Sequence, residues 1–364
     1  MENVYMIAAG GTGGHFYPGF ALAKKLAERG HNVIVVIKKG SPSAEFLLKE
    51  DMNFYEADAE PMPRSKNILE WINFIFKLFS NILAMRKVIK EYRPKVCVGM
   101  GGYVSFPLIF AAYLTGVKTV LHDSNAKIGL ANRVCSKFTD LFLLGLPPVG
   151  NIARGILAGT PIREDFRLKE SEADENYWQF VTDFGINILI FGGSQGARVL
   201  NEAAVKMSET ILAKTNRVHF LHITGRRDYG EIKALYKDNK NVEVIEYSED
   251  IYSLMQAAHL IISRSGASSI AEIISLKKPS ILIPYPFASA NHQYYNAKIL
   301  ADRGCAVMLP QTPRLADDIT DTVKNLMASP ETFKAIHSNF IVAGFPDPLE
   351  AASRCAELIE DIFK

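Results

Sequence analysis

The chain has 364 residues, which at about 100–200 residues per domain favours two domains. Hydrophobic residues make up 48% and charged residues 22% of the sequence, the composition of a packed globular protein and not of a disordered one. The formal net charge is +2, so there is no global electrostatic reason to expect a nucleic-acid partner.

The four cysteines, at positions 97, 135, 305 and 355, form no CxxC pair and no zinc-type spacing. This argues against a disulfide scaffold and against a thiolate metal site. The first residues, Met1-Glu2-Asn3, lack the basic region of a signal peptide, so we expect a cytosolic chain.

Short apolar runs alternate with helical stretches along the chain. Strands are predicted in a first half at residues 4–9, 33–37, 96–100, 119–122 and 141–144, and in a second half at 188–191, 218–223, 242–245, 260–263 and 280–283. These runs are apolar throughout, which indicates parallel strands covered by helices on both faces. The predicted fold class is α/β, with two Rossmann-like doubly wound domains and a ligand cleft between them, at the carboxyl ends of both sheets.

A cluster of proline and glycine between residues 147 and 167 predicts the domain boundary. We expect an N-terminal domain over residues 1–160 and a second domain over 161–345. A further break at 344–348 precedes a last helix within 346–364, which can pack back on the N-terminal domain.

Two stretches are apolar enough to raise the question of a membrane. Residues 96–117 carry no charge over a length that can span a bilayer, but Gly101, Gly102 and Pro107 favour a strand, a loop and a helix start. Residues 68–89 form an apolar helical stretch.

This stretch contains Trp71, Phe74, Phe76 and Phe79, and basic residues in or beside it include Lys77, Arg86 and Lys87. It fits docking on an anionic membrane surface, or a core helix whose lysines reach solvent; the residues leave both open.

Three glycine turns follow predicted strands, at residues 10–14, 99–103 and 192–196. Such turns let backbone N–H groups approach a phosphate or a sugar, although tight strand–helix packing also requires glycine. Phe16 stands where GxGxxG needs its third glycine, Lys38 follows the next strand where an NAD enzyme has an acid, and no GxxxxGK[ST] motif occurs. Dinucleotide and ATP binding are therefore disfavoured.

The segment 264–272 places small residues at a predicted helix start, with Glu272 following. Unbonded N–H groups there suit a diphosphate, and Glu272 can accept from the hydroxyls of a ribose or simply complement the helix dipole.

His15 closes the first glycine turn, where an imidazole can take a proton or serve as a structural group. Asp123 and Asn125 follow another strand and are expected in the same cleft. The sequence has no acidic pair of metal-ligand character, so nothing in it requires a metal ion or another cofactor.

Taken in order, these motifs resemble those of glycosyltransferase family 28. The matching segments are 10–15, 100–105, 122–125, 159–163, 192–198, 264–272 and 292–297. The resemblance implies a GT-B fold and inverting transfer of N-acetylglucosamine from UDP-GlcNAc to the 4-hydroxyl of the muramoyl peptide of lipid I, forming lipid II in peptidoglycan synthesis. It also implies a role in cell-wall biogenesis, cell shape and division, and a peripheral position on the cytoplasmic face of the bacterial cell membrane.

Position by position, the resemblance implies UDP-GlcNAc-binding roles for Thr12, Gly13, Gly14, Asn125, Arg163, Ser194, Ala267, Ser268, Ser269, Ile270, Glu272 and Gln293. The first domain would face the lipid acceptor and the membrane, and the second would bind the UDP-sugar. Inversion needs a base, for which His15 is the first candidate and Asp123 the second. Without a metal, the helix start at 265–269 and Arg163 would stabilise the leaving UDP.

The sequence departs from the family pattern in the acceptor region. The segment 122–125 reads His-Asp-Ser-Asn where the family has His-Glu-Gln-Asn. A related family 28 lipid glycosyltransferase with another UDP-sugar or acceptor is therefore the alternative, beside a non-enzymatic protein of the same fold that binds nucleotide sugars.

Overall fold

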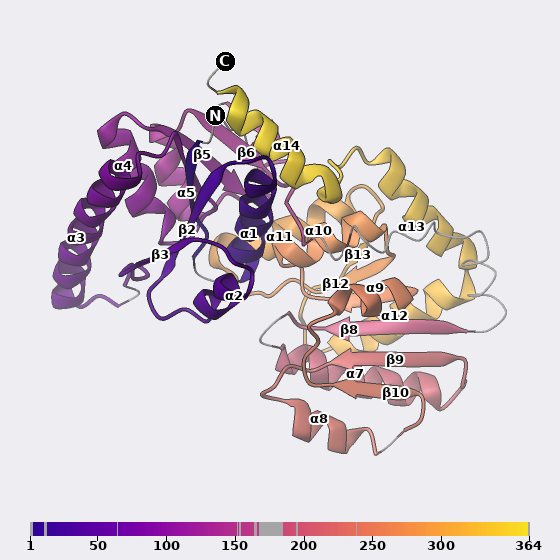
Figure 1. Ribbon diagram of the computed structural model, residues 1–364. Helices are drawn as coiled ribbons and strands as arrows, with labels where there is room; N and C mark the ends of the chain where they lie inside the picture. Colours follow the sequence, from indigo (N-terminus) through magenta and orange to yellow (C-terminus); the bar gives the residue numbers. More distant parts are fainter. Residues whose placement is uncertain are drawn as a thin grey trace. The chain divides into compact units, whose positions relative to one another are not determined.

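The computed structural model describes residues 3–10, 13–63, 65–150, 152, 154–163, 166, 185–193, 196–237 and 239–362. The chain forms two units, one comprising Met1–Glu164 with Pro346–Lys364 and the other Asp165–Phe345. Each unit is built on one parallel sheet (Figure 1).

The first domain has seven strands in the order β3-β2-β1-β4-β5-β6-β7, and every neighbouring pair is parallel. The strands are β1 (Val4–Ala8), β2 (Asn32–Lys38), β3 (Phe54–Ala57), β4 (Val96–Gly99), β5 (Lys118–Asp123), β6 (Leu141–Leu144) and β7 (Gly155–Leu157). The helices are α1 (Gly13–Glu28), α2 (Ser43–Lys49), α3 (Ile68–Tyr92), α4 (Ser105–Thr115), α5 (Leu130–Cys135) and, from the far end of the chain, α14 (Pro348–Asp361).

Consecutive residues of β1 enter two different cores, because successive side chains of a strand point to opposite faces. Tyr5 and Ile7 pack with α1 and α14, whereas Met6 and Ala8 pack with α3 and α4. The sheet is therefore covered on both faces, as its uniformly apolar strands predict.

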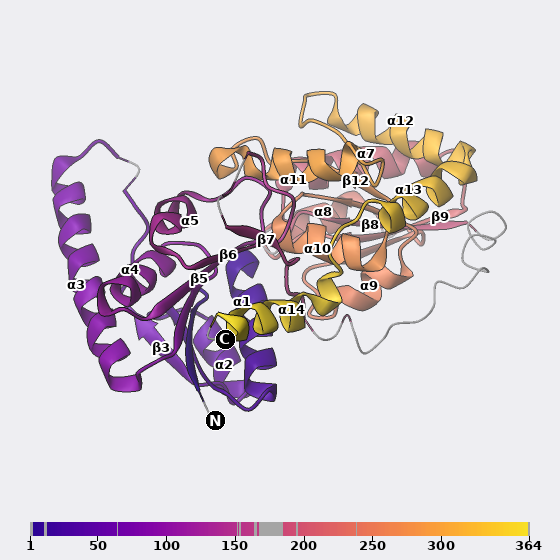
Figure 2. The ribbon, with the colours of Figure 1, turned by 90° about the horizontal axis from the view of Figure 1, so that it is seen from above.

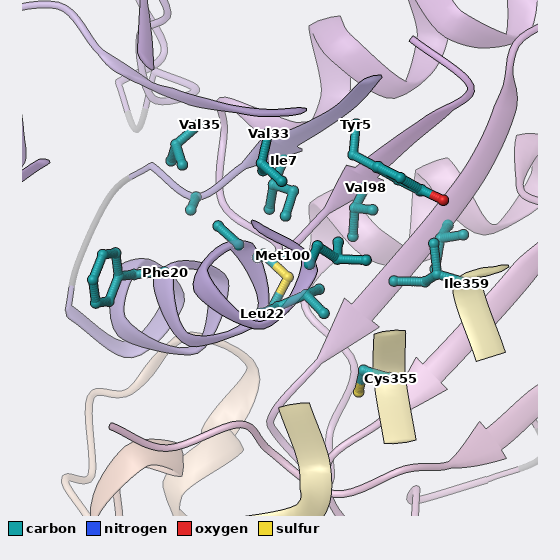
Figure 3. Packing of buried hydrophobic residues seen from close by; sticks show 14 of the residues in the cluster. Tyr5, Ile7, Phe20, Leu22, Val33, Val35, Val98, Met100, Cys355 and Ile359 are labelled. Carbon is teal, nitrogen blue, oxygen red and sulfur yellow. The ribbon is translucent and has the colours of Figure 1, made fainter. Parts of the chain in front are cut away.

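Helix α14 completes the first of these cores. Ile359 lies near Tyr5 and Val98 (Figure 3), and Cys355 belongs to the same buried cluster. At the surface Glu360 accepts from Arg29 at 2.7 Å and bonds the His31 ring at 2.9 Å.

The second domain has six strands, all parallel, in the order β10-β9-β8-β11-β12-β13. They are β8 (Ile186–Phe191), β9 (Val218–Ile223), β10 (Val242–Ile245), β11 (Leu260–Ser263), β12 (Ser280–Leu282) and β13 (Val307–Met308). The helices are α7 (Arg198–Leu212), α8 (Tyr229–Leu235), α9 (Ile251–Ala257), α10 (Ala267–Leu276), α11 (His292–Ala301), α12 (Leu315–Ala328) and α13 (Pro330–Val342).

The structure confirms the α/β class with two doubly wound parallel sheets, and each predicted strand is found within one or two residues of its expected bounds. The prediction missed three strands. Two of them, β3 and β7, are the outer strands of the first sheet, and β13 is one of the two outer strands of the second. Edge strands are only partly covered, so their sequences lack a continuous apolar run.

The two apolar stretches of the sequence form different structures. Residues 96–117 form β4, a turn and α4, as predicted. Among the described residues, one helix, α3, is long and apolar enough to cross a membrane by length and composition, and only 17% of its most apolar window is buried. The core-helix interpretation holds for its second half alone, where Ile82, Met85, Val88 and Ile89 are buried.

Candidate active site

In the first domain the glycine turn after β1 leads directly into α1. Gly13 and Gly14 are the first two residues of the helix and His15 is the third. Thr12 lies outside the described residues. The turn stands at the carboxyl end of β1, the edge where doubly wound sheets bind ligands.

The imidazole of His15 rests on two glycines of the β4–α4 turn. A Cβ added to Gly101 would stand 2.9 Å from His15 Cε1, and one added to Gly102 would stand 3.3 Å from His15 Cδ2. Both glycines have left-handed backbone, with φ of +99° and +73°, which other residues rarely adopt. We call Gly101 and Gly102 the His15 seat.

Asp123 binds its own loop with both carboxylate oxygens. Its Oδ1 accepts from the backbone N–H of Asn125 at 3.0 Å and from the Asn125 side chain at 3.2 Å. Its Oδ2 accepts from the Gly129 N–H at 2.9 Å and from Asn132 Nδ2 at 3.1 Å. Four donors to a buried carboxylate hold the β5–α5 loop in one conformation. Asn132, which the sequence analysis missed, also donates to the backbone of His122 at 2.9 Å.

His122 holds the segment that leads to Arg163. Its Nε2 donates to the Gly159 carbonyl at 2.9 Å, and burial lowers the pKa of its imidazole, so the ring is neutral near pH 7. Arg354 of α14 donates to the neighbouring Ala158 carbonyl at 2.8 Å. Further along, the Arg163 guanidinium carbon lies 5.4 Å from the centre of the Tyr17 ring on α1, a cation–π contact.

In the second domain, β11 ends at Ser263 and α10 begins after Gly266. Gly266 has an extended backbone at the N-cap and offers no side chain to the first-turn N–H groups, whereas α3, α9 and α14 each have an N-cap side chain that accepts one. The first turn contains Ala267, Ser268 and Ser269, and the Ser268 hydroxyl is buried without a protein partner. This helix start therefore presents N–H groups and positive partial charge to an anion.

Ile270 is the fourth residue of this helix. Its N–H donates to the Gly266 carbonyl at 2.9 Å and its side chain is fully buried. Glu272, half-buried, follows in the next turn.

Gln293, at the start of α11, is fixed by two bonds. Its Oε1 accepts from the Tyr285 N–H at 2.9 Å, and its carbonyl accepts from the Ser265 hydroxyl at 2.8 Å. Because a backbone N–H can only donate, the amide oxygen must face Tyr285. Gln293 therefore presents its –NH₂ group, a hydrogen-bond donor, on its other side.

Gly196, which follows β8, is packed against the end of β9. A Cβ on Gly196 would lie 2.2 Å from the Thr224 carbonyl oxygen, so only glycine fits. Asn201 of α7 donates to that same carbonyl at 2.9 Å. Ser194 lies outside the described residues. In the part of the chain that the structure describes, no group of three or more His, Cys, Asp and Glu side chains is arranged to hold a metal ion.

Two Rossmann-like parallel domains, each with glycine turns and helix starts at the carboxyl ends of its strands, define a glycosyltransferase of the GT-B fold. Residues 5–143 match the glycosyltransferase family 28 N-terminal domain, and residues 187–350 match the glycosyltransferase family 28 C-terminal domain. The chain belongs to glycosyltransferase family 28.

Relatives extend over the whole length. The UDP-N-acetylglucosamine–N-acetylmuramyl-(pentapeptide) pyrophosphoryl-undecaprenol N-acetylglucosamine transferase of Elusimicrobium minutum is 41% identical, over 98% of this chain and 99% of that protein. The protein of the same name from Desulforamulus reducens is 33% identical, over 97% and 98%. The crystal structure of Acinetobacter baumannii MurG superposes with a TM-score of 0.78 at 25% identity and covers 99% of this chain and all of that one.

Proposed function

We propose that this glycosyltransferase transfers N-acetylglucosamine from UDP-GlcNAc to the 4-hydroxyl of the lipid-linked muramoyl peptide of lipid I, with inversion, and so forms lipid II. The observation that carries the proposal is the start of α10, where uncapped N–H groups precede Glu272, in a chain similar throughout its length to N-acetylglucosamine transferases. Lipid II formation would place the protein in peptidoglycan synthesis.

The second domain supplies the contacts to the diphosphate and the ribose. The N–H groups of Ala267, Ser268 and Ser269 bind the diphosphate, and Glu272 accepts from the ribose hydroxyls. The –NH₂ group of Gln293 donates to a hydroxyl of the sugar. From the first domain, Gly13, Gly14 and Asn125 contact the sugar and Arg163 contacts the donor. Thr12 and Ser194 keep the donor-binding roles that their motifs predict.

His15 acts as the general base. It takes the proton from the 4-hydroxyl while that oxygen attacks the anomeric carbon, and the bond from the anomeric carbon to the diphosphate breaks with its electrons passing to UDP. Asp123, which accepts four hydrogen bonds, positions Asn125 in our proposal and remains the second candidate base.

The test is UDP release by the purified protein, given a soluble short-chain lipid I analogue and, in turn, UDP-GlcNAc, UDP-galactose and UDP-glucose. We expect acceptor-dependent release from UDP-GlcNAc and little from the other two. Preference for another sugar would establish the alternative lipid glycosyltransferase. UDP-GlcNAc binding without turnover on this acceptor would keep the donor site and discard the acceptor, and no binding of any UDP-sugar would overturn the proposal.

We further propose that α3 docks the first domain on the cytoplasmic face of an anionic membrane, where a lipid-linked acceptor resides. Helix α3 lies along the outer side of this domain beside α4 (Figures 1 and 2). Seven of its apolar side chains are 48–74% exposed and form what we call the α3 patch: Ile68, Leu69, Ile72, Ile75, Phe76, Phe79 and Leu83. An exposed apolar stretch of this size fits insertion at a lipid surface.

The residues predicted to contact the membrane differ in their exposure and in their bonding partners. Phe79 is exposed, whereas Trp71 and Phe74 are half-buried, and Trp71 donates to the Ser65 carbonyl at 3.0 Å. Lys77 is ion-paired with Glu60, which offsets its charge.

Lys87 is exposed, and Arg86 is half-buried with its Nε unpartnered. The better test of docking is therefore the exposed pair Phe76 and Phe79.

Replacing Phe76 and Phe79 by Ser should weaken binding to vesicles of phosphatidylglycerol and phosphatidylcholine by on the order of 10-fold or more, because two aromatic rings no longer enter the lipid. The matched control is Ile341→Ser with Val342→Ser, an exposed apolar pair on α13. Equal losses in both double variants, or no loss in the first, would exclude docking through α3.

A further inference from the structure

Arg264 is a buried cation whose bonding partners are all neutral. Only 6% of the surface of Arg264 is exposed to solvent. Its guanidinium donates to the carbonyls of Ile283 and Pro284 at 3.1 and 3.4 Å, and to Gln311 Oε1 at 2.6 Å, and it lies 5.6 Å from the centre of the Tyr285 ring.

Two other arginines of this chain, by contrast, form ion pairs with carboxylates at the surface. Arg29 is bonded to Glu360, and Arg198 is bonded to both Glu202 and Glu231. A charge taken out of water is costly unless an opposite charge or several hydrogen bonds compensate it. Arg264 makes several hydrogen bonds, but none of their acceptors is a carboxylate. Burial lowers the pKa of its guanidinium, because removal from water disfavours the charged form.

The position of Arg264 explains why such a charge is kept. It stands two residues before the N-cap of α10, so its Cα is within about 7 Å of the Cα of Gly266. Its bonds reach across the carboxyl ends of β11, β12 and β13, and the Ile283–Tyr285 turn that it holds is the one that orients Gln293. The Arg264 side chain thus both holds the donor-binding loops and places a positive charge next to them.

We propose that Arg264 is the buried positive charge that the diphosphate of the nucleotide sugar neutralises, and that it acts through the protein interior as a positioning residue and not by direct contact. This inference rests on the proposed donor site at α10. At a separation of about 10 Å and an effective dielectric constant of about 20, one charge changes the affinity for an anion by on the order of 10-fold. It should therefore favour ligands by their charge and not by their nucleoside.

The test compares the affinities of UDP, UMP and uridine, measured by competition with a fluorescent UDP probe. In Arg264→Gln, which is neutral and can still donate to a carbonyl, UDP affinity should fall by on the order of 10-fold or more while uridine affinity changes by less than about 3-fold. Arg264→Lys, which keeps the charge and loses part of the bonding, should keep the ratio of UDP to uridine affinity within about 3-fold of the wild type.

Lys278→Met is the matched control. Lys278 is also buried and donates to two carbonyls, of Gln256 and Ala258, but it precedes β12 and so lies at the opposite edge of the same sheet. Its loss should lower the melting temperature and leave the UDP to uridine ratio unchanged.

Three outcomes overturn the inference. Equal losses for UDP and uridine in Arg264→Gln would make Arg264 purely structural. If that variant does not fold, a ratio that collapses in Arg264→Lys would show that charge is not what matters. A wild-type protein that binds none of the three ligands would overturn the donor site itself, and the inference with it.

Discussion

The candidate residues of the two domains satisfy their polar groups differently. In the first domain most of these groups bond to one another: Asp123 accepts four donors, His122 is neutral and bonded to Gly159, and the His15 ring rests on a seat of glycines. Two buried atoms there, His122 Nδ1 and Asn132 Oδ1, have no hydrogen-bond partner among the described residues. In the second domain the start of α10 has no side-chain cap and Arg264 has no carboxylate partner in its hydrogen bonds.

The difference indicates a division of work. A bonded network fixes geometry, which suits a base that must meet one hydroxyl, whereas an electrostatically incomplete site gains most when an anion arrives. Changes at His15 and its seat should therefore alter kcat, and changes at Glu272 and Gln293 should alter the binding of UDP-GlcNAc.

The largest effect is expected for His15→Ala. Loss of the base should lower kcat by roughly 10²–10⁴-fold with the KM for UDP-GlcNAc largely kept. Steady-state kinetics with both substrates measure it, and an unchanged melting temperature serves as the folding control. A kcat within a few-fold of the wild type would make His15 a structural residue and move the search for the base to Asp123.

Gly101→Ala should disturb the same step without removing the base. The new methyl group would stand 2.9 Å from His15 Cε1, and displacing a catalytic group by about 1 Å can cost on the order of 10²-fold in kcat. Gly116→Ala is the control, because Gly116 also has a positive φ, +72°, but nothing within 4 Å of an added Cβ. If both variants lose the same activity, backbone strain and not the His15 seat is responsible.

Glu272→Ala should raise the donor KM by on the order of 10-fold or more with a smaller change in kcat, since charge-assisted bonds to the ribose are lost. It should also abolish the preference of the enzyme for UDP over 2′-deoxy-UDP, measured as inhibition constants. Glu331→Ala, at an exposed position of α13, should change neither. Retention of the ribose preference in Glu272→Ala would refute the assignment.

The smallest effect is expected for Gln293→Glu. One carboxylate oxygen can still accept from the Tyr285 N–H, but the other cannot donate as the amide –NH₂ does. The added negative charge should weaken UDP and UDP-GlcNAc alike, and the lost donor should raise the KM for UDP-GlcNAc by about a further 10-fold relative to the inhibition constant of UDP, which lacks the sugar. An unchanged ratio of these two constants would mean that Gln293 does not donate to the sugar.

The sequence predicts the parts of this molecule that depend on local pattern. Continuous apolar runs locate the central strands, and glycines after strands locate the turns, but β3, β7 and β13 lack that pattern because they are only partly covered. Contacts between distant segments leave no local signal. Nothing in the sequence around Asn132 predicts its hydrogen bond to Asp123. Gly101 lies in a motif that predicts a phosphate-binding turn, whereas in the structure it lies against the His15 ring.

Ile270 shows the limit within a motif. Its place in the matching segment predicts a ligand contact, and this stays a prediction. The structure adds that the Ile270 N–H bonds back to Gly266, since a helix start leaves only its first N–H groups unbonded. Spacing along a motif therefore identifies the neighbourhood of a ligand more securely than the individual contacts.

The place of α14 in the chain has a consequence for biosynthesis. The first domain needs Cys355 and Ile359 to close one of its cores, yet the whole second domain is translated before them. At about 5–20 residues per second, the ribosome leaves that core uncovered for on the order of 10 s after the rest of the first domain has emerged. The second domain is contiguous and can complete its fold during this interval. The first-translated domain is thus the last to be finished, and one of its apolar cores stays open during that interval.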